Sequence, residues 1–307
     1  MQSLLVGSIY VLASLGMTLS LAVLKLPNFA HAEILTIGAY ATVIVAILYP
    51  GNVLLAGITA FVLCALIAVA IHYVVFKPLI DRKISIYILM LSSFAVALFL
   101  RYSIYSWASI ENLLFAKPRI PVYVLGQFFG VNITNVEAIA IPLAIIVSLA
   151  LGGFLTFTRM GISMRAVAVN FDLARVSGIK INRVVLVMWV IAGGLAGVGG
   201  SIFAVYTVAT PDMGFNILLE IFTVVIIAGL TSMSGTIVGG YLVGFAENTV
   251  MQALYIYFGV PLTYEPILPF AIMVAVLILR PTGISPNFHK LADYFRKSTV
   301  LKQEAKL

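Results

Sequence analysis

The sequence predicts an all-α polytopic membrane protein: a bundle of about 8–10 transmembrane helices with one helix–turn–helix outside the bilayer. Of its 307 residues, 62% are hydrophobic and only 9% are charged, whereas soluble domains carry roughly 25% charged residues. A soluble fold would need more polar surface to face water, so we expect the chain to span a membrane. The net charge of +7 then indicates basic residues held on one side of the bilayer rather than a nucleic-acid partner.

Nine apolar stretches are long enough, at about 20 residues, to cross a bilayer. They lie at 3–24, 32–49, 53–76, 84–100, 138–157, 184–207, 216–231, 236–258 and 264–280. The second and seventh are short or interrupted by glycine, so the number of crossings is predicted as eight to ten. We expect a single transmembrane domain over residues 1–283, a basic cytoplasmic tail over 284–307, and no cleavable signal peptide.

The distribution of basic residues predicts the orientation. Residues 76–83, residues 158–183 and the chain from 280 onward hold three, five and six of the 18 lysines and arginines. With nine crossings all three regions fall on one side, which the positive-inside rule makes cytoplasmic. The sequence therefore predicts an N-terminus outside, a C-terminus in the cytoplasm and an extracytoplasmic loop over 101–136.

A polar cluster interrupts the apolar sequence in "LPNFAHAE" (26–33). Pro27 cannot continue the preceding helix without losing a hydrogen bond, and Asn28 can cap the helix that restarts. On that helix Asn28 and His31 share one face while Glu33 lies on another, so the histidine and the carboxylate are not expected to form an acid–base pair. Two interpretations stay open: a capped turn between two spans, or a discontinuous helix whose N-terminus faces a translocation pathway.

Further ionisable residues lie inside the predicted spans, where they are costly and usually face a cavity or one another. Glu247, with Asn248 beside it, lies near the middle of its span, and Glu220 lies a few residues into the seventh. Either these residues fix the packing through interhelical hydrogen bonds, or they line a pathway. The candidate pathway residues are therefore Asn28, His31, Glu33, Glu220, Glu247 and Asn248.

No cofactor and no metal site are predicted. The three histidines, at positions 31, 72 and 289, are far apart, and no Cys/His spacing matches a set of metal ligands. The chain has one cysteine, Cys64, in an apolar stretch, so an intramolecular disulfide is impossible.

Small residues recur every four positions in two regions, 192–204 and 235–244. In lipid there is little hydrophobic drive between helices, so close approach over small side chains is a main source of association. Either these stripes pack the middle of the bundle or they line a pathway that closes. The candidate packing residues are Gly193, Gly197, Gly200, Gly240 and Gly244.

Residues 161–179, "GISMRAVAVNFDLARVSGI", look like a helix–turn–helix outside the membrane. Asn170 is a good N-cap, Asp172 suits the positive end of the helix that follows, and Gly178 fits the position just past the end of that helix. Apolar side chains are available at Met164, Val167, Leu173 and Val176. The segment is either a docking element for a partner's groove or a solvated basic loop that only sets the topology.

Four motifs, in order, resemble those of the branched-chain amino acid permeases of ATP-binding-cassette (ABC) importers. They are "LPNFAHAEILTIGAY", similar to the family's N-F-A-H-G-E signature, the loop "GISMRAVAVNFDLARVSGIKINRV", "GLTSMSGTIVGGYLVGFAEN" and the closing "LILRPTGI". The resemblance runs from the first span to Gly283 and favours the subunit type with the N-F-A-H-G-E-like motif. Ala32 replaces a family glycine, and the segment 228–237 departs from the usual glycine-rich version, which leaves the exact solute open.

The resemblance implies the transmembrane subunit of an importer that takes up branched-chain or related amino acids across a prokaryotic plasma membrane by alternating access. It implies three kinds of partner: cytoplasmic ATPase subunits, an extracytoplasmic solute-binding protein, and a homologous second permease in a heterodimer. The chain contains no Gly-Lys dipeptide and hence no Walker A loop, so we expect no enzymatic activity of its own. The ATPase-docking motif matches Gly161, Met164, Arg165, Ala166, Ala174, Arg175 and Gly178.

Two alternative functions remain. One is an ABC permease for urea or short amides, because such permeases look similar. The other is a secondary transporter or channel that works without ATP, since intramembrane carboxylates would serve proton or sodium coupling. The loop at 161–179 argues against this second alternative.

Overall fold

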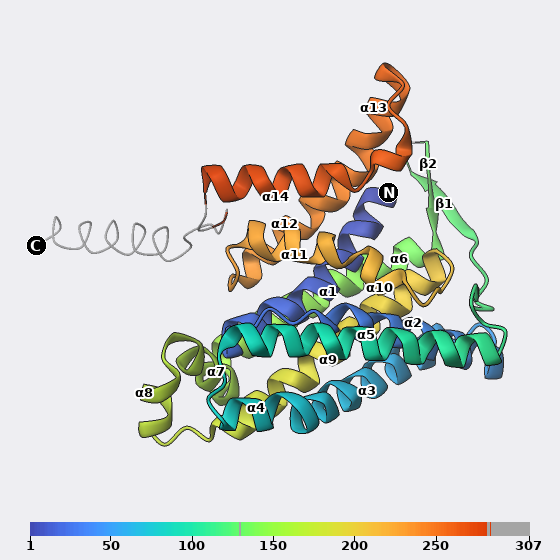
Figure 1. Ribbon diagram of the computed structural model, residues 1–307. Helices are drawn as coiled ribbons and strands as arrows, with labels where there is room; N and C mark the ends of the chain where they lie inside the picture. Colours follow the sequence, from blue (N-terminus) through green and yellow to red (C-terminus); the bar gives the residue numbers. More distant parts are fainter. Residues whose placement is uncertain (129, 281–282, 284–307) are drawn as a thin grey trace, which may run out of the picture.

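The computed structural model describes residues 1–128, 130–280 and 283, and shows a bundle of long helices with a small β-hairpin at one end (Figure 1). Within these residues seven helical segments are long and apolar enough to cross a membrane. They are α1 (Gln2–Leu24), α2 (Ala30–Leu48), Val53–Asp81, α5 (Ile86–Ile110), α6 (Asn135–Phe157), α9 (Ile181–Tyr206) and Leu262–Leu279. The predicted all-α membrane fold is confirmed. The predicted tail at 284–307 lies outside the described residues.

Two of these segments contain irregular turns. Val53–Asp81 consists of α3 (Val53–Ile71), the π-helical turn η1 (His72–Phe76) and α4 (Lys77–Asp81), and Leu262–Leu279 consists of the 3₁₀ turn η3 (Leu262–Tyr264) and α14 (Ile267–Leu279). The π-turn packs against α9, because the ring of Phe76 stacks on that of Trp189 with 5.4 Å between the centroids.

The remaining two predicted crossings differ from a simple spanning helix. The stretch 216–231 forms the short α10 (Met213–Asn216) and then α11 (Leu218–Ala228), whose 11 residues reach about 16 Å, roughly half of the ~30 Å hydrocarbon core. The stretch 236–258 lies in α12 (Met233–Phe245), the π-turn η2 (Ala246–Val250) and α13 (Met251–Phe258), which together form a continuous 26-residue helical run. In Figure 1, α13 rises away from the bundle.

Helix α1 lies at the centre of the bundle. It is buried from Leu5 to Val23, and it contacts α6, α9, α11 and α12. α2 packs on the other side of α9, between α3 and α5. Because α1 has almost no exposed face, it needs no amphipathic pattern, and its apolar residues are spread around the whole helix.

The two ends of the bundle differ in character. At one end, here called the basic end, lie Lys25, Arg165 and Thr231, which line a common cavity. The helices α7 (Arg159–Val169) and α8 (Phe171–Val176) project there (Figure 1). At the opposite end, here called the hairpin end, lie the N-terminus and the antiparallel strands β1 (Val124–Phe128) and β2 (Val131–Thr134).

The loop predicted over 101–136 is shorter than expected, because α5 continues to Ile110 and α6 already begins at Asn135. The start of α6 is fixed by a reciprocal capping box, in which Thr134 accepts from the Glu137 amide and the Glu137 carboxylate accepts from the Thr134 amide. Arg101, expected in this loop, is therefore a residue of helix α5.

Glycines allow the central helices to approach each other closely. A Cβ built on Gly38 of α2 would lie 2.5 Å from the carbonyl oxygen of Gly197 and 2.6 Å from its Cα, so the two backbones are in contact. Gly200 contacts the backbone of Leu35 in the same way. The other three candidate packing glycines also lie against neighbouring helices: Gly193 on α3, and Gly240 and Gly244 on α1.

Replacing Gly38 with alanine should force α2 and α9 apart, because backbone atoms cannot move aside as a flexible side chain can. We expect a destabilisation of about 1–3 kcal/mol, as for other overpacked sites, visible as a lower midpoint of thermal unfolding in detergent.

Gly57→Ala provides the matched control, since a Cβ at Gly57 in α3 meets nothing within 4 Å. Alanine there should leave the midpoint unchanged or raise it, because alanine is the better helix former. Equal midpoints for the two variants would show that the Gly38–Gly197 contact does not limit the packing.

Candidate functional site

Helix α2 begins inside the bundle rather than at its end. Asn28 Oδ1 accepts a hydrogen bond from the Ala30 amide at 3.1 Å, and the Asn28 carbonyl accepts from the His31 amide at 3.3 Å. The His31 ring nitrogen Nε2 lies 2.8 Å from the carbonyl oxygen of Ala13, in the middle of α1. Asn28 and His31 are both almost completely buried. This geometry favours the discontinuous-helix interpretation of the polar cluster over a surface turn.

Glu33 pairs with a residue that the sequence did not suggest. Arg101 donates from Nε at 3.1 Å and from Nη2 at 2.7 Å, both to Glu33 Oε1. Glu33 is 1% exposed, and its other oxygen, Oε2, has no hydrogen-bond partner among the described residues. Thus His31 and Glu33 have separate partners on separate helices. The available signal was only general: a buried charge needs a partner, and Arg101 follows the apolar stretch 84–100 directly, but nothing in the sequence links it to Glu33.

The same region receives α10, the short helix before α11. The Gly214 amide donates to Thr36 Oγ1 of α2 at 3.0 Å, and the Tyr105 hydroxyl of α5 donates to the Asp212 carboxylate just before α10. The ring of Phe215 lies under the guanidinium of Arg101, with 3.7 Å between the Arg101 Cζ and the ring centroid. Polar contacts therefore join α2, α5 and α10 inside the bundle.

Glu247, Asn248 and Glu220 lie elsewhere. Tyr10 of α1 donates its hydroxyl proton to Glu247 Oε2 at 2.5 Å. Asn248 donates to the Gly244 carbonyl of its own helix at 3.2 Å. Glu220, in the first turn of α11, is 2% exposed, and its Oε2 has no partner among the described residues. The six candidate pathway residues are thus not one site. Three lie at the α2 break and two at η2, and Glu220 of α11 is close enough to Glu247 and Tyr10 to interact with them electrostatically.

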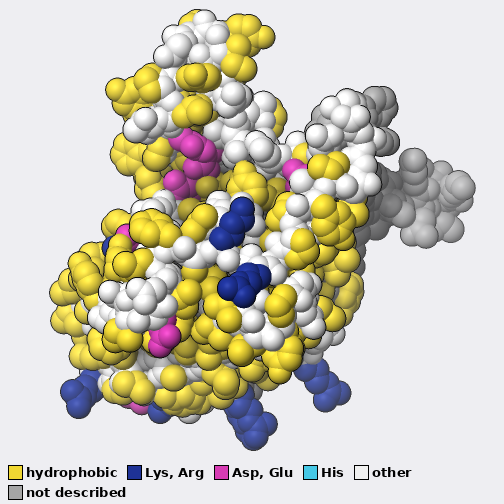
Figure 2. Space-filling view, turned by 90° about the vertical axis from the view of Figure 1, so that its right-hand side faces the viewer, with side chains coloured by type: hydrophobic (Ala, Val, Ile, Leu, Met, Phe, Trp, Pro, Cys, Tyr) yellow, Lys and Arg dark blue, Asp and Glu magenta, His cyan; other side chains and the backbone are white. Residues whose placement is uncertain are grey.

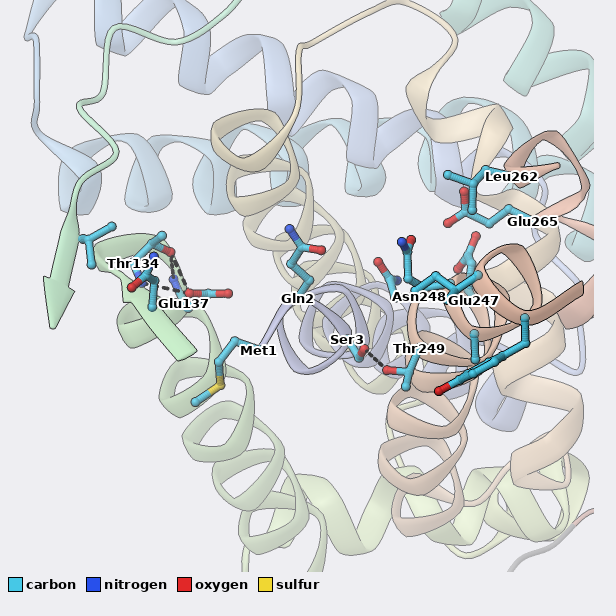
Figure 3. Close-up of a pocket in the computed structure, with 16 residues that line it drawn as sticks. Met1, Gln2, Ser3, Thr134, Glu137, Glu247, Asn248, Thr249, Leu262 and Glu265 are labelled. Carbon is cyan, nitrogen blue, oxygen red and sulfur yellow. Dashed lines mark hydrogen bonds between the residues drawn. The ribbon is translucent and has the colours of Figure 1, made fainter. Parts of the chain in front are cut away.

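Glu247 and Asn248 face an open cavity of about 860 Å³ at the hairpin end, here called the hairpin-end recess. In Figure 3, Glu247, Asn248 and Glu265 lie on one side of it and Thr134 and Glu137 on the other. Its lining contains three carboxylates and, within the described residues, no lysine or arginine. Figure 2 views this end of the molecule: most of the surface is hydrophobic, and acidic side chains gather beneath the projecting upper part. The recess suits a cationic group.

At the basic end, α7 and α8 form the predicted helix–turn–helix. Asn170 Oδ1 accepts from the Leu173 amide at 2.9 Å, and Gly178 follows α8 with φ +82°. The two helices present three strongly exposed apolar side chains at the surface. These are Val169, Leu173 and Val176, at 87%, 64% and 86% exposure.

The residues of the predicted docking motif divide between two faces. The side that faces the bundle carries Gly161, Met164, Val167 and Ala174, all buried. Met164 and Val167 were expected as apolar groups for a partner, but they hold α7 on the bundle instead. Arg165, Arg175 and Gly178 are exposed, and Ala166 is half-buried.

In the part of the chain that the structure describes, no group of three or more His, Cys, Asp or Glu side chains could hold a metal ion. Long apolar helices, a helix that breaks inside the bundle and carboxylates buried beside it are features of membrane transport proteins. The fold and the polar sites therefore define a multi-pass membrane permease. The sequence matches the family model described as branched-chain amino acid transport system / permease component over residues 1–277, and the chain belongs to this family.

Named relatives agree with this family. A probable branched-chain amino acid transport permease protein LivH of Methanocaldococcus jannaschii is 29% identical, over 92% of this chain and 90% of the relative. The high-affinity branched-chain amino acid transport system permease proteins LivH of Escherichia coli and BraD of Pseudomonas aeruginosa are each 28% identical. They cover 91% and 92% of this chain, and 91% and 93% of their own lengths. The family is a transport component and not an enzyme.

Replacing Tyr10 with phenylalanine should destabilise the protein by about 1–3 kcal/mol, because Glu247 would remain buried without its donor. A lower midpoint of thermal unfolding in detergent would show this. Tyr49→Phe removes a hydroxyl from a side chain that is 58% exposed and should leave the midpoint unchanged. If both variants unfold at the temperature of the wild type, the Tyr10–Glu247 hydrogen bond does not stabilise the bundle.

Proposed function

We propose that this chain is the permease subunit of an ABC importer that takes up branched-chain or related amino acids across a prokaryotic plasma membrane. The family match over residues 1–277 carries the proposal, and the named relatives are branched-chain amino acid permeases that align over nine-tenths of the chain. In this proposal, residues 1–283 form the transmembrane permease domain and 284–307 a basic cytoplasmic tail.

The basic end is the cytoplasmic end in this proposal, and the N-terminus lies outside. Lys77, Arg82 and Lys83 precede α5, and Arg159 and Arg183 lie near the ends of α6 and α9 at the same end of the bundle. Only Lys117 and Arg119 lie in the described loop at the hairpin end. This asymmetry follows the positive-inside rule.

A separate ATPase subunit drives alternating access by pressing on α7 and α8. The exposed Val169, Leu173 and Val176 form an apolar surface that fits a groove in such a partner. The movement reaches the bundle directly, since α7 contacts α1, α6 and α9. A solute-binding protein delivers the amino acid at the hairpin end, and a homologous second permease completes the transmembrane unit.

Uptake of radiolabelled leucine, isoleucine and valine should require ATP. The test uses proteoliposomes that contain the complete complex, with loaded solute-binding protein outside and ATP present or absent inside. Uptake at the same rate without ATP would instead support a secondary transporter or channel. If the cognate binding protein instead binds urea or short amides preferentially, the transported solute is one of those compounds.

Val176→Asp and Val169→Asp should abolish co-purification of the ATPase subunit, because each places a charge in an apolar docking surface. Val122→Asp is the matched control, since Val122 is 48% exposed in the loop at the hairpin end. The comparison of Val176→Asp with Val122→Asp also tests the orientation of the chain in the membrane. Loss of the ATPase with Val122→Asp but not with Val176→Asp would mean that the hairpin end is cytoplasmic.

A further inference from the structure

A mixed cluster of charged and aromatic side chains lies where α2, α5 and α10 meet. Its members, here called the α5–α10 cluster, are Arg101, Tyr105, Asp212 and Phe215, with Glu33 behind Arg101. Arg101 lies well inside the 25-residue span α5. Charged groups at membrane depth are costly unless they are paired or serve a pathway.

In the ion pair between Arg101 and Glu33, each partner has hydrogen-bonding atoms that the other does not use. Both Arg101 bonds go to the single oxygen Oε1 of Glu33, while Oε2 is buried without a partner among the described residues. Arg101 uses Nε and Nη2, and Nη1 donates to no atom of the described residues. A guanidinium presents its donors in a planar fork that matches a carboxylate, so Nη1 of Arg101, a residue that is 9% exposed, is a donor left for a carboxylate.

The α5–α10 cluster also contains an anionic group and an aromatic ring. Asp212, which accepts from the Tyr105 hydroxyl, is only partly buried. Phe215, stacked on the guanidinium, is 44% exposed. Two turns before Arg101 on α5, Phe94 belongs to a second aromatic group: Phe29 lies 5.8 Å from Phe94 and 5.2 Å from Phe222, measured between centroids. Lipid is a poor neighbour for the exposed polar groups of this face.

We propose that the α5–α10 cluster binds the substrate amino acid as a zwitterion. Nη1 of Arg101 takes the α-carboxylate, Asp212 takes the ammonium group, and the phenylalanine rings take the aliphatic side chain. With Glu33 the cluster holds two carboxylates and one guanidinium. A zwitterion leaves this net charge unchanged, and it pairs its ammonium with Asp212 and its carboxylate with Arg101. The hairpin-end recess offers three carboxylates and, within the described residues, no lysine or arginine, so no side-chain guanidinium fork is available there for the carboxylate of the molecule. This proposal rests on the proposed function and deepens it.

Direct binding tests the two polar contacts separately. Saturation-transfer NMR on the purified complex, without the binding protein, measures the binding of leucine and of two analogues. The analogue 4-methylpentanoate lacks the ammonium group, and isoamylamine lacks the carboxylate. Glu33→Gln/Arg101→Gln should weaken 4-methylpentanoate binding at least tenfold and keep isoamylamine. Asp212→Asn should show the opposite pattern. The double substitution removes both charges of the Glu33–Arg101 pair together, so it does not leave Glu33 buried without its counter-ion.

Leucine uptake by the complete importer in proteoliposomes, at saturating loaded binding protein, provides the second measurement. Arg101→Lys keeps the positive charge beside Glu33, but an ammonium is not a planar fork, and the initial rate should fall at least fivefold. The double variant should fall at least tenfold. Ser103→Ala, at an exposed serine of α5 whose hydroxyl donates to the Phe99 carbonyl of the same helix, should match the wild type.

Two results would overturn the proposal: uptake by the double variant within twofold of the wild type, or loss of both analogues in both binding variants. The first would make Arg101 only the counter-ion of Glu33, and the second would make the cluster only structural. Failure of the proposed function looks different, because wild-type complex would then show no ATP-dependent leucine uptake at all.

Discussion

A helix that breaks inside a membrane bundle leaves backbone N–H and C=O groups that lipid cannot satisfy. The chain meets this constraint at residues 25–29 with partners from its own side chains and from α5. Asn28 Oδ1 accepts from the Ala30 amide, and Ser93 Oγ of α5 accepts from the Phe29 amide at 3.2 Å and donates to the Met90 carbonyl at 2.7 Å. The second interruption, before α11, uses the same means, since Thr36 of α2 accepts from the Gly214 amide. The α2 break also approaches α11, since the rings of Phe29 and Phe222 lie 5.2 Å apart between centroids.

The close contacts of α9 follow from the same arrangement. A segment that restarts deep in the bundle has to lie against helices on all sides, and α2 does so by touching Gly197 and Gly200 with the backbones of Gly38 and Leu35. Because these backbone contacts leave no room for side chains, the position of one helix relative to another has to be fixed by the few polar groups that remain. Glu33 with Arg101 and Tyr105 with Asp212 supply it, and they fix α5 and α10 relative to α2.

The sequence predicts most of the fold because each spanning helix carries its own signal, an apolar run of sufficient length. The helix break could also be predicted, since Pro27 disfavours continuation of the helix before it and Asn28 can cap the helix after it. The partner of Glu33 could not, because Arg101 lies 68 residues further along the chain and no periodicity links them. The stretch 216–231 was expected to form one crossing on its mean hydropathy, but Gly229, with φ +85°, ends α11 after 11 residues. The hairpin-end recess was likewise beyond prediction, because its walls come from the N-terminus, residues 124–137 and residues 247–265.

Helix α1 connects the three polar regions of the molecule. Near its start Tyr10 holds Glu247 at the hairpin-end recess, at its middle the Ala13 carbonyl holds His31 at the α2 break, and its last turn lines cavities beside α7 with Val23. A buried helix with close-packed neighbours moves as a rigid body, since packed interiors deform little. In the proposed mechanism, a displacement of α7 that shifted α1 along its axis would change the His31 contact and the Tyr10–Glu247 hydrogen bond together. Under the proposed function, α1 would then be the one physical element through which the basic end acts on both the α2 break and the recess at the other end.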